Sequence, residues 1–392
     1  MPKTSLLIFF FCASALSACS EAPLISRDVQ PHLNRPGALA LVPGTDFAIV
    51  ANTNPDIREK SGSMIAVNMA TKALVPESLI AIPSLAGRLA VDVPRSRVYV
   101  VDRAEDGLLI YQYSIPGPSG EPIAFAPVAA PTPIEKSANA VQTDNNPYDV
   151  YEAVGTPAGD LLFVTNLLDG SVSAIDADTL LPMDLNPMDG ALNGLPLISS
   201  ANFQSVGSRP GRGASRMTPG PDGTLLYVAS TLTSQIYILD IAGRQVEGVL
   251  DLSGVSAAGG VRGIAVSTAG LAYVTHRGIG SVVVLDVSNI HETGDHFRVI
   301  SPTIVDIIPT GHGVDGIALS SDETKVFVTD NLENTLTVID TAKRAVDTKF
   351  LLGALPAEIV PDAARGVMYV LNLLSDSISV IDQTTLSVET IQ

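Results

Sequence analysis

A short pair of β-strands recurs along this chain, and the recurrence limits the possible folds more than any other feature. In the clearest copy, the strand Val326-Phe327-Val328-Thr329-Asp330 is followed by a short polar turn and a second strand, residues 335–340. Alternating apolar residues, rich in β-branched side chains, are typical of strands. The first strand of this pair occurs in seven copies, centred on Ile49, Tyr99, Phe163, Tyr227, Tyr273, Phe327 and Tyr369.

The spacing of the copies predicts the architecture. Neighbouring copies are separated by between 42 residues (327 to 369) and 64 residues (99 to 163). This is enough for four short strands and their turns, which form one blade of a β-propeller. No segment of a dozen residues has a helical period, and a linear array of sheets would leave its end faces bare. We therefore predict an all-β fold, a seven-bladed β-propeller of four-stranded antiparallel blades, spanning residues 36–392.

Two copies resemble a known repeat. Phe163-Val164-Thr165-Asn166 precedes the strand 171–176, and Tyr369-Val370-Leu371-Asn372 precedes the strand 377–382. Both are similar to the YVTN-type β-propeller repeats of bacterial and archaeal surface proteins, which resemble the lactonase-like seven-bladed propellers in pattern. The resemblance covers residues 36–392 and implies the fold. It does not imply one function, because this repeat serves binding, scaffolding and enzyme roles alike.

The N-terminus has the features of an export signal. Lys3 precedes an apolar run, residues 6–15, which is too short to cross a bilayer as a mature helix. The run ends in Leu16-Ser17-Ala18-Cys19, which resembles a bacterial lipobox. The resemblance implies cleavage before Cys19 and acylation of that residue, which would anchor the protein stably. We expect residues 1–18 to be a lipoprotein signal peptide and residues 19–35 to be the lipidated cysteine with its tether. A secretory signal with a coincidental cysteine is the alternative.

The same resemblance bears on location and partners. Ser20 follows the cysteine where an aspartate would favour retention in the inner membrane. We therefore expect a lipid-anchored envelope protein, on the periplasmic or surface face of the outer membrane. Residues 24–29 belong to the tether or add an edge strand to the last blade. The formal net charge of −18 argues against a nucleic-acid partner, because phosphate binding needs a basic surface.

Charged residues are expected around the mouth of the central channel, which the first strand of each blade lines. Counting back from each of the seven central residues locates the residue of the first strand that lies at the mouth. In blade three, this count leaves Asp149, Tyr151 and Glu152 as alternatives. Either the charges pair with one another across the channel, or the arginines bind a small anionic ligand through a carboxylate or phosphate group. The candidate ligand-site residues are Arg88, Glu152, Arg216, Arg262, His276, His312, Asp315 and Glu358.

Other recurring polar residues have simpler explanations. The aspartates that end the third strands are expected to cap the following turns by accepting backbone hydrogen bonds, rather than to bind calcium. They are Asp176, Asp240, Asp286, Asp340 and Asp382. The polar residues that end the second strands are expected to start tight loops. They are Asn52, Asp102, Asn166, Ser230, His276, Asp330 and Asn372, among which His276 breaks the series of small side chains.

No motif predicts a cofactor, a metal or a catalytic residue. The segment 291–296 holds two histidines and two carboxylates, but a solvated loop explains it as well as a divalent ion does. Nucleophile elbows, phosphate loops, paired zinc ligands and haem attachment motifs do not occur in the sequence. Two long insertions, residues 116–146 and 182–213, are rich in turn-forming residues and are expected to be recognition loops.

The predicted function is a non-catalytic binding or assembly platform for an envelope protein. The first alternative is a lactonase-like hydrolase that acts at the channel mouth through some of Glu152, His276, His312 and Glu358, or a binder of a small anion there. The second alternative is a propeller subunit that contributes part of a redox cofactor site, although the chain offers no attachment motif for one.

Overall fold

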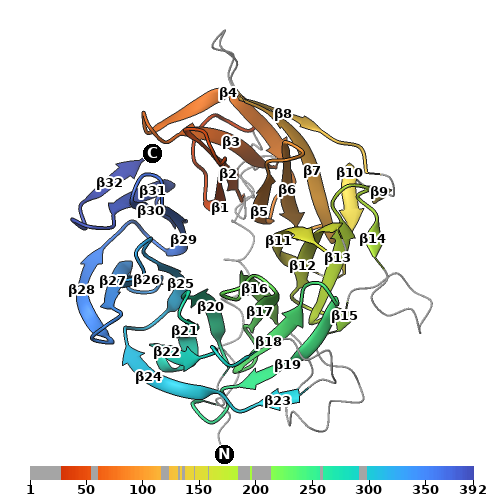
Figure 1. Ribbon diagram of the computed structural model, residues 1–392. Coiled ribbons are helices and arrows are strands. Elements are labelled where there is room, and N and C mark those ends of the chain that lie inside the picture. The colour runs from red at the N-terminus through yellow and green to blue at the C-terminus, as the bar shows by residue number, and fades with distance from the viewer. Residues whose placement is uncertain are drawn as a thin grey trace, which may run out of the picture.

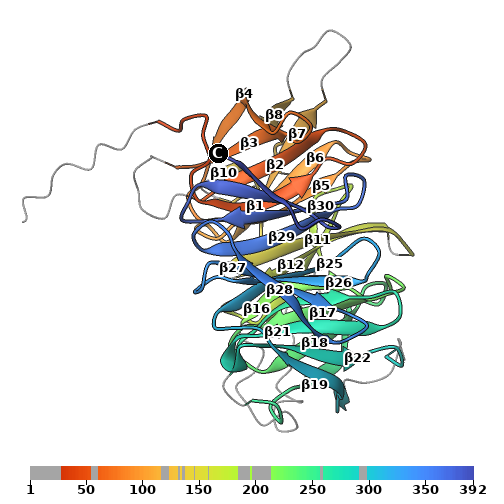
Figure 2. The same cartoon turned by 90° about the vertical axis from the view of Figure 1, so that its left-hand side faces the viewer.

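Seven β-sheets surround a central axis in the computed structural model (Figure 1), which confirms the predicted seven-bladed propeller. The structure describes residues 28–53, 61–115, 123–130, 133–134, 137–144, 146–157, 159–183, 195–196, 213–256, 259–290 and 298–392. Each blade is built on consecutive antiparallel strands that run outward from the axis, and Figure 2 shows the ring from its edge. The described residues contain no helix of the length and hydropathy needed to cross a bilayer.

The first four blades contain both regular and extended sheets. Blade one is β1 (Pro36–Leu41), β2 (Phe47–Asn52), β3 (Gly62–Asn68) and β4 (Ala73–Ile82). Blade two is β5 (Ala86–Asp92), β6 (Arg97–Asp102) and β7 (Gly107–Ser114), with β8 (Ala124–Pro127), β9 (Pro133–Ile134) and β10 (Ser137–Gln142) outside. Blade three is β11 (Pro147–Thr156), β12 (Gly159–Asn166) and β13 (Ser171–Asp176), flanked by β14 (Pro182–Met183) and β15 (Leu195–Pro196). Blade four is β16 (Ala214–Pro219), β17 (Leu225–Ser230), β18 (Gln235–Asp240) and β19 (Gln245–Asp251).

The last three blades keep the four-stranded pattern. Blade five is β20 (Val261–Val266), β21 (Leu271–His276), β22 (Ser281–Asp286) and β24 (Thr303–Pro309), with a 3-10 turn η1 (Arg277–Ile279). Before β24, the strand β23 (Arg298–Ile300) pairs in parallel with β19 of blade four. Blade six is β25 (Val314–Leu319), β26 (Lys325–Asp330), β27 (Thr335–Asp340) and β28 (Ala345–Leu351). Blade seven is β29 (Pro356–Asp362), β30 (Val367–Asn372), β31 (Ser377–Asp382) and β32 (Val388–Ile391).

The ring has two faces, which the strand directions define. We call the face at which the first strand of every blade begins the mouth face. The second strands end there, so it also carries the turns between the second and third strands. The opposite, far face carries the turns between strands one and two and between strands three and four. The seven first strands contact one another in sequence, and β29 contacts β1, so the innermost layer is closed.

The repeated aromatic and aliphatic residues form the core between blades. All seven central residues of the second strands are at most 1% exposed. Tyr99 of blade two, for example, packs with Val150 and Leu162 of blade three. Burying a side chain of this size contributes about 1.5–3 kcal/mol each, so the repeat stabilises every junction between blades.

Threonines near the ends of second strands connect neighbouring blades. Gly263 donates its backbone N–H to Thr275 Oγ1 at 2.7 Å. Thr275 Oγ1 in turn donates to the carbonyl oxygen of Asp315 in blade six at 2.9 Å. The equivalent hydroxyls of Thr165 and Thr329 make the same two kinds of contact. One hydroxyl therefore satisfies polar backbone groups of two adjacent first strands, which cannot pair as a sheet.

The predicted turn caps are confirmed, and in blades two to seven the residues that end the second strands are followed by turns as expected, but their side chains are buried. The five capping aspartates each accept a backbone N–H from the turn that follows. The seven residues that end the second strands are at most 1% exposed. In blade three, Asn166 Nδ2 donates to Ser171 Oγ and Ser173 Oγ, both at 3.0 Å. Asn52, Asp330 and Asn372 likewise hydrogen-bond to side chains of the third strand of their own blades.

Blades seven and one contact each other, but neither contributes a strand to the sheet of the other. Arg35 donates its backbone N–H to Asp376 Oδ1 at 2.7 Å on the mouth face. On the far face, Arg365 donates to the side chain of Asp46 and to the carbonyl oxygen of Thr45. The last blade already has four strands of its own, and residues 28 and 29 are not in a strand. Residues 24–27, the rest of the suggested edge strand, lie outside the described residues.

Candidate functional site

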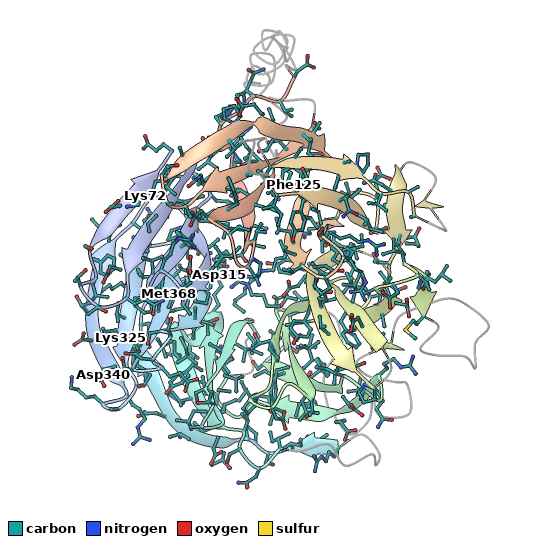
Figure 3. All side chains as sticks on the ribbon, turned by 45° about the horizontal axis from the view of Figure 1, so that its top comes forward. Lys72, Phe125, Asp315, Lys325, Asp340 and Met368 are labelled. Carbon is teal, nitrogen blue, oxygen red and sulfur yellow. The ribbon has the colours of Figure 1, made fainter. Side chains whose placement is uncertain are left out.

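A ring of equivalent positions on the first strands forms the candidate site. In every blade, the residue after this position pairs with a valine of the second strand. The ring positions are Ala38, Arg88, Asp149, Arg216, Gly263, Gly316 and Glu358, and the preceding residues of blades five and six are Arg262 and Asp315. Asp315 lies at the inner edge of the ring (Figure 3). The ring therefore combines three guanidinium groups with three carboxylates.

Arg88 connects blades two, three and seven. Its Nη2 lies 2.9 Å from Glu358 Oε1, and its Nη1 lies 3.7 Å from Asp149 Oδ2. Blade one does not obstruct the contact with Glu358, because its ring residue is Ala38. Burial alone would lower the pKa of Arg88, but the two carboxylates raise it above its usual value. Burial raises the pKa of both Glu358 and Asp149, and Arg88 opposes that rise.

Arg216 makes a second connection across the channel. Its Nη2 lies 3.4 Å from Asp315 Oδ1 of blade six, past Gly263 of blade five. The other carboxylate oxygen of Asp315 accepts a hydrogen bond from Asn331 Nδ2 at 3.0 Å. The structure thus brings together Arg88, Arg216, Asp315 and Glu358, and it pairs all four charges.

Glu152 does not belong to this group, because Asp149 takes the ring position of blade three. In that blade, Phe163 pairs with Tyr151, twelve residues earlier (163 − 151), whereas Phe327 pairs with Ala318, nine residues earlier (327 − 318). The longer hairpin shifts the ring position by three residues, from 152 to 149. Glu152 instead lies 3.6 Å from Arg95 Nη1 near the far face. Burial and the neighbouring Asp92 carboxylate raise the pKa of Glu152 to about 7.

Neither histidine joins the ring. His276 is fully buried between blades four and five, with Nε2 3.2 Å from Ser234 Oγ, and burial lowers its pKa. It fills the position that asparagine, aspartate or serine fills in the other blades. His312 is exposed in the connection between β24 and β25, where its backbone N–H donates to Glu333 Oε1 at 2.9 Å. The four residues considered for a hydrolase, Glu152, His276, His312 and Glu358, are therefore not brought together.

A pair of charged connections on the far face was not predicted. In blade two, Arg95 Nη1 lies 3.2 Å from Asp92 Oδ2 and its Nη2 lies 2.7 Å from Asp160 Oδ2 of blade three. Tyr99 donates its hydroxyl to Asp92 at 2.8 Å. Asp362, Arg365 and Tyr369 repeat the arrangement in blade seven. The shared spacing Asp-x-x-Arg-x-x-x-Tyr was the available signal, and it marks contacts between blades.

Exposed leucines also recur on the mouth face, and they were not predicted from the sequence. Each lies in the turn between strands two and three, two residues after the buried polar residue. They are Leu168 (57% exposed), Leu232 (62%), Leu332 (63%) and Leu374 (53%), from blades three, four, six and seven. We call this set the leucine rim. Isolated exposed leucines are common on protein surfaces, and these four are distinguished by recurring at one turn position on one face.

Several predicted features fall outside the described residues. These are Cys19 and the signal peptide, the segment 291–296, and most of the insertion 182–213; the insertion 116–146 is described in part. Within the described part of the chain, no group of three or more histidine, cysteine, aspartate or glutamate side chains is placed to hold a metal ion.

Comparisons with known proteins identify the fold class. No protein-family profile and no curated protein sequence matches the chain. The β-propeller domain of Cps50 (Swd1) from Myceliophteria thermophila is similar, with a TM-score of 0.62, 9% identity and coverage of 89% of this chain and 97% of that chain. A protein from Lactobacillus plantarum has a TM-score of 0.57 and 17% identity, covering 82% and 86%. Virginiamycin B lyase from Staphylococcus aureus has a TM-score of 0.57 and 13% identity, and the match covers 88% of this chain and 94% of the lyase chain.

At these identities the likeness establishes the fold alone. The chain is a seven-bladed β-propeller.

Proposed function

We propose that this propeller is a non-catalytic binding platform, anchored to the outer membrane through an acylated Cys19, that holds an envelope protein on its mouth face. The observation that carries the proposal is the leucine rim. Four leucines at least 53% exposed occupy equivalent turns around the channel mouth. Burial of apolar surface is a main driving force of protein association, and exposed apolar side chains gathered on one face mark candidate interaction sites. The YVTN-type resemblance and the lipobox support an envelope location.

The path of the chain before β1 supports an orientation in which the mouth face is turned toward the membrane. Leu33 is buried in the junction of blades seven and one, and Arg35 is hydrogen-bonded to a mouth-face turn of blade seven. The chain therefore leaves the folded ring at the mouth face. Between Cys19 and Asp28 there are nine residue steps (28 − 19), which reach at most about 30 Å when extended. A lipid on Cys19 would keep the mouth face close to the membrane, where a membrane-associated partner lies.

The hydrolase alternative has weaker support. It needs an acid or base within hydrogen-bond reach of a substrate. His276 is fully buried, Glu152 lies near the far face, and the carboxylate of Glu358 pairs with Arg88. Because the ring carboxylates pair with Arg88 and Arg216, none of them is free to act as a base at the channel mouth.

Partner capture tests the platform. The tagged full-length protein is recovered from solubilised envelope membranes of its source organism, and co-purifying proteins are quantified. Replacing all four rim leucines by serine is expected to lower recovery of a specific partner more than tenfold, because each buried leucine contributes about 1.5–3 kcal/mol. Leu181→Ser is the matched control, since Leu181 is 43% exposed on the far face. An unchanged set of partners in the rim variant would refute the proposal.

A further inference from the structure

We infer that the channel mouth contains an oxyanion-binding site centred on Arg262, which takes a carboxylate or phosphate group. The inference rests on the charge balance of the ring and goes beyond the proposed platform. It would hold whether or not the leucine rim binds a protein.

The three carboxylates of the ring are already committed. Arg88 pairs with Glu358 and Asp149, and Arg216 pairs with Asp315. Asp149 Oδ2 also accepts the backbone N–H of Met217 at 2.8 Å. Two arginines therefore account for all three acids, which leaves the third arginine of the ring without a counter-charge.

Arg262 has no ion pair and no hydrogen-bond partner among the described residues, and its Nε is buried. A guanidinium presents five N–H donors, and burying a charged donor without an acceptor is costly. The other two arginines of the ring avoid that cost by pairing. Because Arg262 is only half-buried, water in the channel or an anion from outside the described residues must supply the missing acceptors, and only an anion would also neutralise the charge.

The position of Arg262 places it beside the channel. It precedes the ring position of blade five, as Asp315 does in blade six. Asp315 reaches Arg216 from that position, past blade five, so a side chain there is directed toward the lumen. The ring residue next to Arg262 is Gly263, which has no side chain to cover it.

A second arginine of blade five adds to the positive charge. Arg277, in the mouth-face turn η1, donates from Nη2 to the amide oxygen of Asn331 at 3.1 Å and forms no ion pair with a described residue. Blade five therefore presents two unneutralised guanidinium groups in a chain whose formal net charge is −18. A planar oxyanion matches a guanidinium because two parallel N–H groups can bind its two oxygens.

Thermal unfolding of the full-length protein in detergent tests the site. Inorganic phosphate, succinate and a hexaglutamate peptide are titrated at constant ionic strength, with sodium chloride as the reference. At least one probe is expected to raise the Tm of the wild type by about 2 °C in a saturable manner, because a ligand that binds only the folded state stabilises it. Arg262→Gln is expected to abolish this shift, whereas Lys343→Gln, on the exposed far face, is expected to keep it.

The direction in which Arg262→Gln changes Tm in the absence of any probe provides the second readout. In buffer without these probes, Arg262→Gln is expected to leave Tm unchanged or to raise it, because it removes an unpaired and partly buried charge. Protection by phosphate or succinate would assign the site to free small anions, and protection by the peptide alone would assign it to carboxylates of a protein. Equal shifts in wild type and Arg262→Gln, or a lower Tm for Arg262→Gln in probe-free buffer, would overturn the inference.

Discussion

Replacing Gly316 by alanine is expected to destabilise the propeller by about 3 kcal/mol, at the upper end of the cost of overpacking a core. Gly316 lies on the first strand of blade six, where neighbouring first strands approach most closely. An added Cβ would lie 2.2 Å from the carbonyl oxygen of Ala357 in blade seven and 3.0 Å from Thr329 Oγ1. The shorter contact is with backbone of the first strand of blade seven, which cannot rotate away as a side chain could, so relief requires blades six and seven to separate.

Urea denaturation measures this effect, and Gly254→Ala is its control. A Cβ at Gly254 would have no atom within 4 Å, so that variant is expected to unfold with wild-type stability. A loss of less than about 1 kcal/mol for Gly316→Ala would show that the inner ring is looser than the structure implies, since overpacking a tight core costs more.

Replacing Arg88 by methionine is expected to cost about 3–4 kcal/mol at pH 8, because it leaves buried carboxylates without their counter-charge. Glu358 is only 7% exposed, and its Oε2 already lacks a hydrogen-bond partner. Burial raises the pKa of Glu358 even with Arg88 present, and the substitution is expected to raise this pKa further.

The pH dependence of the Arg88→Met defect follows from the raised pKa of Glu358. A carboxyl group whose pKa is raised by folding binds a proton more readily in the folded state than in the unfolded state. Its contribution to stability is complete below the unfolded pKa, near 4.3, and is lost as the pH rises through the folded pKa. The defect is therefore expected to shrink between pH 8 and pH 5 in urea titrations. Arg88→Met combined with Glu358→Gln is expected to recover much of the loss, and a defect independent of pH would contradict the pairing.

The repeat was sufficient to predict the fold because its information is local. Strand periodicity and the capping aspartates depend on neighbouring residues in the chain, and both are confirmed. Counting along the strands also predicted the ring residues Arg88, Arg216 and Glu358. It misplaced blade three, because a hairpin three residues longer cannot be recognised from the aligned second strand alone.

Features that depend on contacts between blades could not be predicted. Sequence spacing does not reveal that Arg88 reaches past blade one, or that Arg216 and Arg88 take all three acids and leave Arg262 unpaired. Leu332 looked like a residue of a polar turn, and only its place on the mouth face relates it to Leu168 and Leu232. His276 was expected to start a tight loop, but it is buried between blades, with Nε2 3.2 Å from Ser234 Oγ of blade four.

Site-specific photo-cross-linking in intact cells of the source organism tests the central claim, that the mouth face is the binding surface, most directly. A photoreactive phenylalanine derivative replaces Leu332 of the rim in one strain and Leu181 of the far face in another, both exposed in the folded protein. The account predicts a discrete protein adduct from position 332 and none from position 181. No adduct from position 332, or an adduct from position 181 alone, would contradict it.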